Sequence, residues 1–394
     1  MTNGEKRLVL SVIGTLTFAS VYATLVMAPV LTQISDEFGV STGTAGLVAA
    51  AYGGPGIVTS LLIGPYSDRF GRKRFLVAGA FVMGIFTIVS ALAPTFELLI
   101  AARAIAGIGG SLIFPNANAL IGDLFAYRER GRAMSTVIGF NTMASVIGVP
   151  VAGVVAEATS WRVSVGLVGV IAIVAGIGLA IFLRPARTNI NADRIWGMYR
   201  LILSNPSAVF AIISSFLGSL YWFTWITYLV VFFQKTYGLS EGTASTYSLT
   251  LGLGVLVGSQ IGGRVGDRIG HRRVVAGTIV ASGLILLALT AAPPPLIAAA
   301  AMNLLLSAVI GARFATNTSL LTEQVPEARG TLFAFSSATA SLSIVVGAAI
   351  GGFFVDTIGF AAIGVFCMGA ALLSSVIVLA FVREEPMEVD LGVA

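Results

Sequence analysis

Two arginines interrupt long apolar runs of this sequence, and their chemistry gives the first indication of function. Arg103 lies in the apolar segment 97–122, and Arg313 lies in the apolar segment 296–321. A charged side chain in such a segment is costly, so it faces a partner, a water-filled cavity or a ligand. A guanidinium donates two parallel hydrogen bonds to a carboxylate or a phosphate. Because no carboxylate lies at the same depth, we expect Arg313 to bind an anionic group of a solute, whereas Arg103 has the alternative of a hydrogen bond to backbone carbonyls.

A short charged stretch occurs twice. Residues 64–74 read GPYSDRFGRKR, and residues 263–273 read GRVGDRIGHRR. The aspartates of the two copies, Asp68 and Asp267, are 267 − 68 = 199 positions apart, about half of the 394-residue chain. Two copies at this offset indicate an internal duplication. The glycines suit tight turns, so each copy predicts a short polar loop between two helices.

Several kinds of chemistry lack the residues that they need. The sequence contains no P-loop, and it has one histidine, His271, and one cysteine, Cys367. An intrachain disulfide, a His/Cys metal cluster and a membrane-buried Ser-His-Asp set therefore cannot be built. We expect no cofactor, no metal site and no enzymatic activity.

The composition predicts a multi-pass membrane protein. The chain is 56% hydrophobic and 10% charged, whereas a soluble domain carries about 25% charged residues. A membrane helix needs about 20 apolar residues. Twelve such segments are expected, at residues 8–31, 43–65, 75–94, 97–122, 133–156, 163–184, 206–232, 243–263, 274–293, 296–321, 331–355 and 358–382.

The basic residues predict the orientation of these helices. If the N-terminus is cytoplasmic, 19 basic residues lie inside, and two, Arg162 and Lys235, lie outside. Both termini are then cytoplasmic, and the expected location is the inner or plasma membrane. The net charge of +5 is explained by the loops, so no nucleic-acid partner is expected.

The duplication predicts the architecture. We expect an all-α membrane protein with twelve transmembrane helices in two parallel six-helix repeats. The expected parts are an N-terminal half at residues 1–184, a cytoplasmic linker at 185–205, and a C-terminal half at 206–394.

With these features the sequence resembles the major facilitator superfamily, and most of all its twelve-helix drug/proton antiporters, which include sugar and nucleoside exporters. The stretch at 64–74 matches the signature loop between helices 2 and 3 of that superfamily, and the stretch at 263–273 matches its second-half copy. Residues 103–107, RAIAG, resemble the R-x-x-x-G motif of helix 4. Residues 148–153, GVPVAG, resemble the exporters' helix-5 motif, with one residue inserted between Gly148 and Pro150 and with Gly153 at its end.

The resemblance implies roles for particular residues. The charged stretch becomes a latch that holds the outward-open state, with Asp68 at the start of helix 11 and Asp123 paired to Arg69 or Arg72. The position 199 residues after Asp123 is Thr322, so we expect the second latch to lack this partner. The predicted latch residues are Gly64, Asp68, Arg69, Gly71, Arg72, Asp123, Asp267 and Arg268. Helix 5 is expected to bend where it meets helix 8.

Helices 1, 4, 7 and 10 line the central cavity in this superfamily. By that resemblance, the predicted substrate-binding residues are Tyr22, Arg103, Asn116, Asn118, Tyr221, Trp225, Arg313 and Asn317. Helix 1 carries no carboxylate between residues 8 and 31, unlike many proton-coupled members.

The predicted function is secondary transport of a small organic solute by alternating access, as efflux by proton antiport. Protons are the candidate coupling ion, and a monomer in a lipid bilayer is expected. One alternative is a uniporter or exchanger of an organic anion without proton coupling. The alternative from another class is a membrane-embedded receptor or enzyme, which would need a catalytic cluster or a sizeable soluble domain.

Overall fold

The computed structural model describes residues 3–125, 127–183 and 193–384, and all regular structure in this part of the chain is helical. The first helices are α1 (Asn3–Leu25), α2 (Met27–Phe38), α3 (Thr42–Phe70), α4 (Arg72–Ala91), α5 (Phe96–Ser111), α6 (Ile113–Leu124), α7 (Tyr127–Met143), the π-helix η1 (Ala144–Gly148), α8 (Val149–Ala158) and α9 (Trp161–Phe182). The remaining helices are α10 (Asp193–Leu203), α11 (Pro206–Tyr237), α12 (Glu241–Thr246), α13 (Leu249–Ile269), α14 (His271–Ala291), α15 (Leu296–Gln324), the 3-10 helix η2 (Pro326–Ala328), α16 (Arg329–Thr357) and α17 (Phe360–Phe381).

The expected all-α membrane architecture is confirmed. Eleven helical stretches of the described residues are long and apolar enough to cross a membrane. The remaining expected segment, 243–263, corresponds to α12 and α13, which are helical but are not among the eleven. Glycines and the charged residues Arg264, Asp267 and Arg268 make α13 less apolar. The same glycines allow close packing, because a side chain at Gly258 or Gly262 would overlap the backbone of Ala308 or Ala312 in α15.

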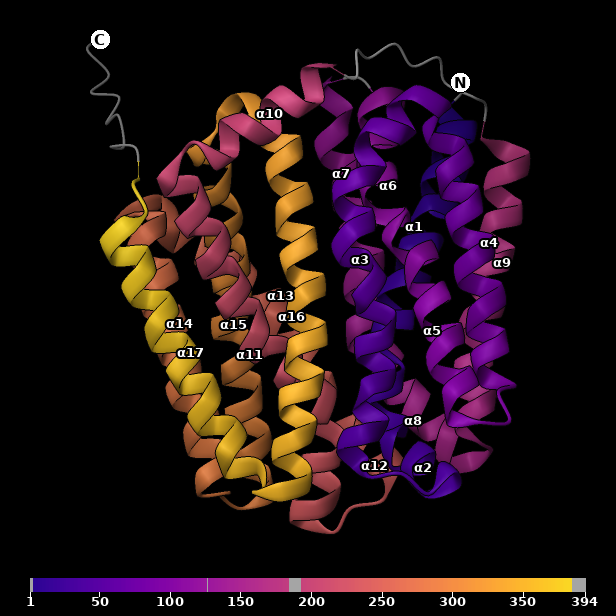
Figure 1. Ribbon diagram of the computed structural model, residues 1–394, viewed down its shortest axis with the longest axis vertical. Coiled ribbons are helices and arrows are strands. Elements are labelled where there is room, and N and C mark those ends of the chain that lie inside the picture. Colours follow the sequence, from indigo (N-terminus) through magenta and orange to yellow (C-terminus); the bar gives the residue numbers. More distant parts are fainter. Residues whose placement is uncertain (1–2, 126, 184–192, 385–394) are drawn as a thin grey trace.

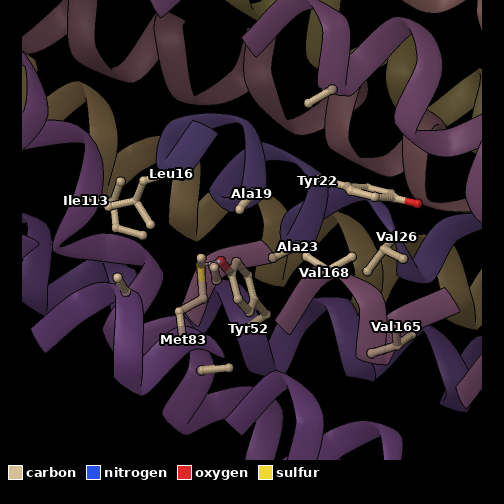
Figure 2. Packing of buried hydrophobic residues seen from close by; sticks show 14 of the residues in the cluster. Leu16, Ala19, Tyr22, Ala23, Val26, Tyr52, Met83, Ile113, Val165 and Val168 are labelled. Atoms are coloured by element: carbon tan, nitrogen blue, oxygen red, sulfur yellow. Dashed lines mark hydrogen bonds between the residues drawn. The ribbon is translucent and has the colours of Figure 1, made fainter. Parts of the chain in front are cut away.

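The helices form a bundle whose two ends differ (Figure 1). Helix α10 crosses one end, which we call the α10 end, and α2, α8 and α12 lie at the opposite end, which we call the α12 end. Most buried apolar side chains fall into two clusters, one largely from residues 9–183 and one largely from residues 202–382. Figure 2 shows part of the first cluster, where Tyr52 lies beside Ala23 and Met83. We call the two groups of helices that carry these clusters the N-half and the C-half.

The two charged stretches are helical rather than loops, which corrects the expectation from their glycines. Helix α3 continues through Gly64 and Pro65 to Phe70, and α13 continues to Ile269. The turn that follows is one residue in each case, Gly71 with φ +95° and Gly270 with φ +96°. L side chains rarely adopt such a backbone conformation, so glycine is required at both of these turns.

The same turns show that the internal repeat is structural. After the first turn, Lys73 Nζ donates a hydrogen bond of 2.8 Å to the carbonyl of Ala180 at the end of α9. After the second turn, Arg272 donates to the carbonyl of Leu379 at the end of α17. Both pairs are related by the same offset, since 272 − 73 = 199 and 379 − 180 = 199. A cation at a helix C-terminus is stabilised by the exposed carbonyls there.

Candidate functional site

Polar contacts between the halves seal the α12 end. Asp356 of α16 accepts hydrogen bonds from Ser41 Oγ at 2.5 Å and from the Gly43 amide at 2.9 Å. The Tyr228 hydroxyl donates to the Ala348 carbonyl at 2.7 Å, and it lies 3.4 Å from the Gly43 carbonyl. Further inter-half contacts join Thr32 to Gln234, Lys235 to Thr42, Ser240 to Glu157, and the Gly242 amide to Glu157. Of the hydrogen bonds that cross between the halves within the described chain, only that of Tyr199 in α10 to the Leu61 carbonyl lies at the α10 end.

A cavity of about 450 Å³ lies between the halves near the middle of the bundle. Its wall is built from residues of α1, α3, α5, α6, α7, η1, α8, α11, α13, α15 and α16. The aromatic part of the wall comprises Phe114, Trp222, Phe223 and Phe314. The polar part consists of hydroxyl and amide groups, among them Thr24, Ser60, Ser111, Asn141, Thr142 and Ser341. The residues that line this cavity include no charged side chain.

Arg313 lies directly behind this wall. Its side chain is 1% exposed, and its guanidinium carbon lies 4.9 Å from the ring centre of Phe314, which lines the cavity, and 5.7 Å from that of Tyr221. Gly218 of α11 leaves the space that the guanidinium occupies, because a Cβ there would overlap Nη1 of Arg313. Neither Nε nor Nη1 has a hydrogen-bond acceptor among the described residues. The expected position in the cavity wall is therefore taken by Phe314, and Arg313 is packed within the C-half.

Arg103 is held within the N-half. Its side chain is fully buried, Nη2 donates to the Ala23 carbonyl at 2.8 Å, and the guanidinium lies 4.3 Å from the ring centre of Tyr52. This is the hydrogen bond to a backbone carbonyl that the sequence analysis gave as the alternative for Arg103. The described ion pairs include neither Arg103 nor Arg313.

On α11, the structure places a different tryptophan at the cavity. Tyr221 is fully buried and accepts a hydrogen bond from Ser282 at 2.9 Å, while Trp225 donates to Asn303 at 2.9 Å. Both therefore face the interior of the C-half, and Trp222 lines the cavity instead. The aromatic residues of this helix are close together in sequence, so the choice depends on a helix rotation that the sequence does not give.

The other predicted binding residues also lie outside the cavity wall. Tyr22 is buried against Gly148, and Asn116 is buried with its side-chain amide donating to the Leu112 carbonyl at 2.7 Å. Asn317 donates to Ser215 at 3.0 Å, and Asn118 is exposed. None of the eight predicted binding residues lines the cavity, although Arg313 touches its wall through Phe314.

At the α10 end, Arg72 forms an ion pair with Asp123 and donates to the Ala119 carbonyl at 2.8 Å. The side chains of Asp68 and Arg69 lie outside the described part of the chain, and Arg268 is exposed. In the C-half, His271 Nε2 lies 3.6 Å from Glu323 and 3.7 Å from Asp267. The expectation that Thr322 leaves this turn without a carboxylate was wrong, because Glu323, one position later, takes that place.

The helix-5 motif lies against α12, α13 and α1. Proline removes one backbone donor, and the π-helix Ala144–Gly148 precedes Pro150. A Cβ at Gly148 would lie 3.0 Å from the Tyr22 ring, and one at Gly153 would overlap the Ser245 side chain of α12. Val146 packs against Gly252 of α13 in the same region. Gly153 and Gly252 therefore allow close approach between the halves, whereas Gly148 allows close packing on α1 within the N-half.

Sequence reasoning missed the residues that seal the α12 end. Asp356, Glu157 and Glu241 were assigned no role from the sequence. Asp356 and Glu157 accept inter-half hydrogen bonds, and Glu241 is 8% exposed. Helical periodicity within one segment carries no information on which half such a residue meets, so no sequence signal identified them.

Comparisons with known proteins agree with this architecture. The model of the Major Facilitator Superfamily matches residues 11–261 and 242–392. The uncharacterized MFS-type transporter YwfA of Bacillus subtilis is 24% identical over 366 residues, which cover 91% of this chain and 88% of the relative. The gentisate transporter of Corynebacterium glutamicum is 26% identical over 265 residues, which cover 60% of this chain and 56% of the relative.

Among solved structures, the fold is similar to that of a bacterial homologue of the human lysosomal transporter Spinster in an inward-facing, occupied conformation. The TM-score is 0.78 at 16% identity, and the match covers 96% of this chain and 95% of the other. Together with the match of the family model, the two helical halves and the cavity between them lead to one conclusion: this chain is a member of the major facilitator superfamily and a multi-pass membrane transporter.

Proposed function

We propose that this protein exports a small organic anion by alternating access, with protons moving in the opposite direction. The observation that carries the proposal is the cavity between the halves, which is sealed at the α12 end by hydrogen bonds such as those that Asp356 accepts from Ser41 and Gly43. Transport by alternating access requires such a site near mid-membrane, with one side closed at a time. The arrangement corresponds to a state that is accessible from the α10 end.

The positive-inside rule supports a cytoplasmic α10 end, because the basic turns that contain Arg72 and Arg272 lie there. The α12 end then faces outward, and both termini are cytoplasmic in an inner or plasma membrane. We propose that residues 1–184 and 206–394 move against each other about the linker 185–205, and that the protein acts as a monomer. In this scheme the latch consists of Asp68 and Asp267 together with the Arg72–Asp123 pair. It holds the outward-open state, in which the α12 end is open.

An anionic solute is supported by the surroundings of Arg313. Burying a guanidinium without a hydrogen-bond acceptor is costly, and a ligand anion would remove this cost. Rotation of Phe314 would bring Nε and Nη1 into contact with the cavity, whose wall itself provides aromatic rings and hydroxyls. A planar carboxylate fits this combination, and gentisate, named in one relative, is such an anion.

A binding screen tests the solute class. Ligands that bind the folded state raise its thermal stability, so aromatic carboxylates are expected to raise the melting temperature of the purified transporter more than organic cations of equal size. This larger rise in melting temperature with aromatic carboxylates should disappear in Arg313→Gln. Stabilisation by cations alone would contradict the proposal.

A further inference from the structure

Glu241 lies where the two halves meet at the α12 end. It is the first residue of α12, and its side chain is only 8% exposed. Helix α12 packs against α2 and α8 of the N-half and against α11 of its own half. One carboxyl oxygen of Glu241, Oε1, has no hydrogen-bond partner among the described residues. The contact between the halves therefore buries a carboxyl group that it does not satisfy.

The groups that face Glu241 do not compensate a negative charge. Helix α2 contributes Gln33 and Asp36, and α8 contributes Glu157. Glu157 is itself held in this contact, because it accepts hydrogen bonds from Ser240 at 3.1 Å and from the Gly242 amide.

The cations near Glu241 interact with other residues. On α11, Lys235 donates to Thr42 Oγ1 at 3.2 Å. Next to α2, Arg162 is paired with Glu37. An ionised Glu241 would thus be buried beside two other carboxylates, which is unfavourable both through desolvation and through repulsion.

We propose that Glu241 is a proton-binding site, and that closure of the α12 end takes up a proton there. With the halves in contact, the neutral carboxyl avoids the cost of a buried charge. With the halves apart, the group is hydrated and ionises as an ordinary glutamate. Proton binding and closure of the α12 end are then linked, so each favours the other. This assigns a role to a residue outside the cavity and outside the charged turns.

The direction of the pH dependence follows from the two states. The pKa of Glu241 in the closed state is raised from 4.5 to about 7, mainly by burial; a hydrogen bond from Gln33 lowers this pKa, and the charges of Glu157 and Asp36 raise it. Between these two values the closed state binds a proton that the open state does not. Closure is therefore favoured as the pH falls through this window, by up to about tenfold per pH unit. Above pH 7 the preference is lost, and opening of the α12 end becomes easier.

A distance measurement tests the inference without a solute. Leu92 and Ile297 are 72% and 85% exposed, and they lie near the α12 end in the N-half and the C-half. Spin labels at Leu92→Cys and Ile297→Cys, in a Cys367→Ser background reconstituted in nanodiscs, report the opening of this end. The short-distance population of the labelled parent should grow relative to the long-distance one by about tenfold or more from pH 8 to pH 5.5. Glu241→Gln should stay closed over the same range.

Controls separate Glu241 from other titrating groups. Glu97→Gln removes an exposed carboxylate at the same end, and it should keep the parent's response. Asp36→Asn removes one repelling charge, so it should move the midpoint to lower pH even if Glu241→Gln does not fold. If the pH dependence of the label distance persists in Glu241→Gln but disappears in His271→Gln, it originates at the α10 end. That outcome would overturn the inference. A labelled parent that does not respond to pH would overturn it as well.

The inference rests on alternating access but not on the solute. If no organic anion is transported, the proposed substrate class fails, whereas the distance response at Glu241 remains measurable. If the response is absent while anions are transported, the proton site fails alone.

Discussion

The guanidinium of Arg313 lies 5.7 Å from the ring centre of Tyr221, and both side chains are almost completely buried in the C-half. The ring centre of Phe314 lies 4.9 Å from the guanidinium, and Phe314 lines the cavity. A cation is thus kept next to the cavity by aromatic rings, and no ion pair of the described residues joins it to a carboxylate. This relationship is the basis of the proposed anion selectivity.

Removing that cation should weaken binding of an organic anion. A hydrogen bond to a charged group contributes about 1.5–3 kcal/mol, so Arg313→Gln is expected to weaken binding by about 10- to 100-fold. Arg313→Lys should retain part of the affinity, because it keeps the charge but loses the planar fork. Arg264→Gln, which removes an exposed arginine of α13, is the matched control for titration calorimetry. Parent affinity in both Arg313 variants would contradict the assignment.

The two tryptophans of α11 should behave differently. Trp225 is 1% exposed and donates to Asn303, so Trp225→Ala should cost about 3–5 kcal/mol of stability and leave a buried amide oxygen without its donor. Trp222 lines the cavity, so Trp222→Ala should lose solute affinity with a smaller loss of stability. Thermal unfolding and solute binding, measured on both variants, test this difference. If Trp225→Ala mainly loses affinity and Trp222→Ala mainly loses stability, the assignment of Trp222 to the cavity is refuted.

The glycines at the α12 end should control its closure. A Cβ at Gly43 would overlap the backbone carbonyl of Gly352, and a backbone carbonyl cannot move aside as a side chain can. Gly43→Ala should therefore favour the open α12 end, which the labels at Leu92→Cys and Ile297→Cys would report as longer distances. Gly122→Ala is the control, since no atom lies within 4 Å of its added Cβ. Unchanged distances in Gly43→Ala would show that this contact does not limit closure.

The charged turns at the α10 end should matter for transport rather than for folding. Asp68→Asn and Asp123→Asn should remove most transport while membrane insertion and melting temperature stay near those of the parent. Asp267→Asn should have the smaller effect, because His271 faces both Asp267 and Glu323. Initial transport rates at matched expression give the comparison. Normal rates in both Asp68→Asn and Asp267→Asn would exclude a latch.

Much of the fold could be predicted from the sequence, because its signals are local or repeated. The 199-residue offset between Asp68 and Asp267 corresponds in the structure to two equal glycine turns, at Gly71 and Gly270. The length of the apolar runs predicted the long helices, although α13 is not among those apolar enough to cross a membrane by composition. The turns were expected to be longer, since the glycines of residues 64–74 predicted a polar loop, whereas α3 continues to Phe70.

The site was harder to predict, because it depends on helix rotation and on contacts between the halves. Trp222 and Trp225 lie three residues apart, and only packing decides which of them faces the cavity. Arg313 was expected in the cavity wall, but Gly218 provides space for it inside the C-half. The burial of Glu241 depends on α8, which is distant in sequence, so its acidic side chain carried no signal of its own.

The most direct test of the account is solute flux in proteoliposomes with an imposed pH gradient. Liposomes are loaded with an aromatic carboxylate, and its release is followed with and without an inward proton gradient, for the parent and for Arg313→Gln. The account predicts that the gradient accelerates release from parent liposomes, that an organic cation is not released, and that Arg313→Gln loses most of the flux. A release rate that is the same with and without the proton gradient would indicate a uniporter or exchanger. Flux of cations without flux of carboxylates would contradict the account.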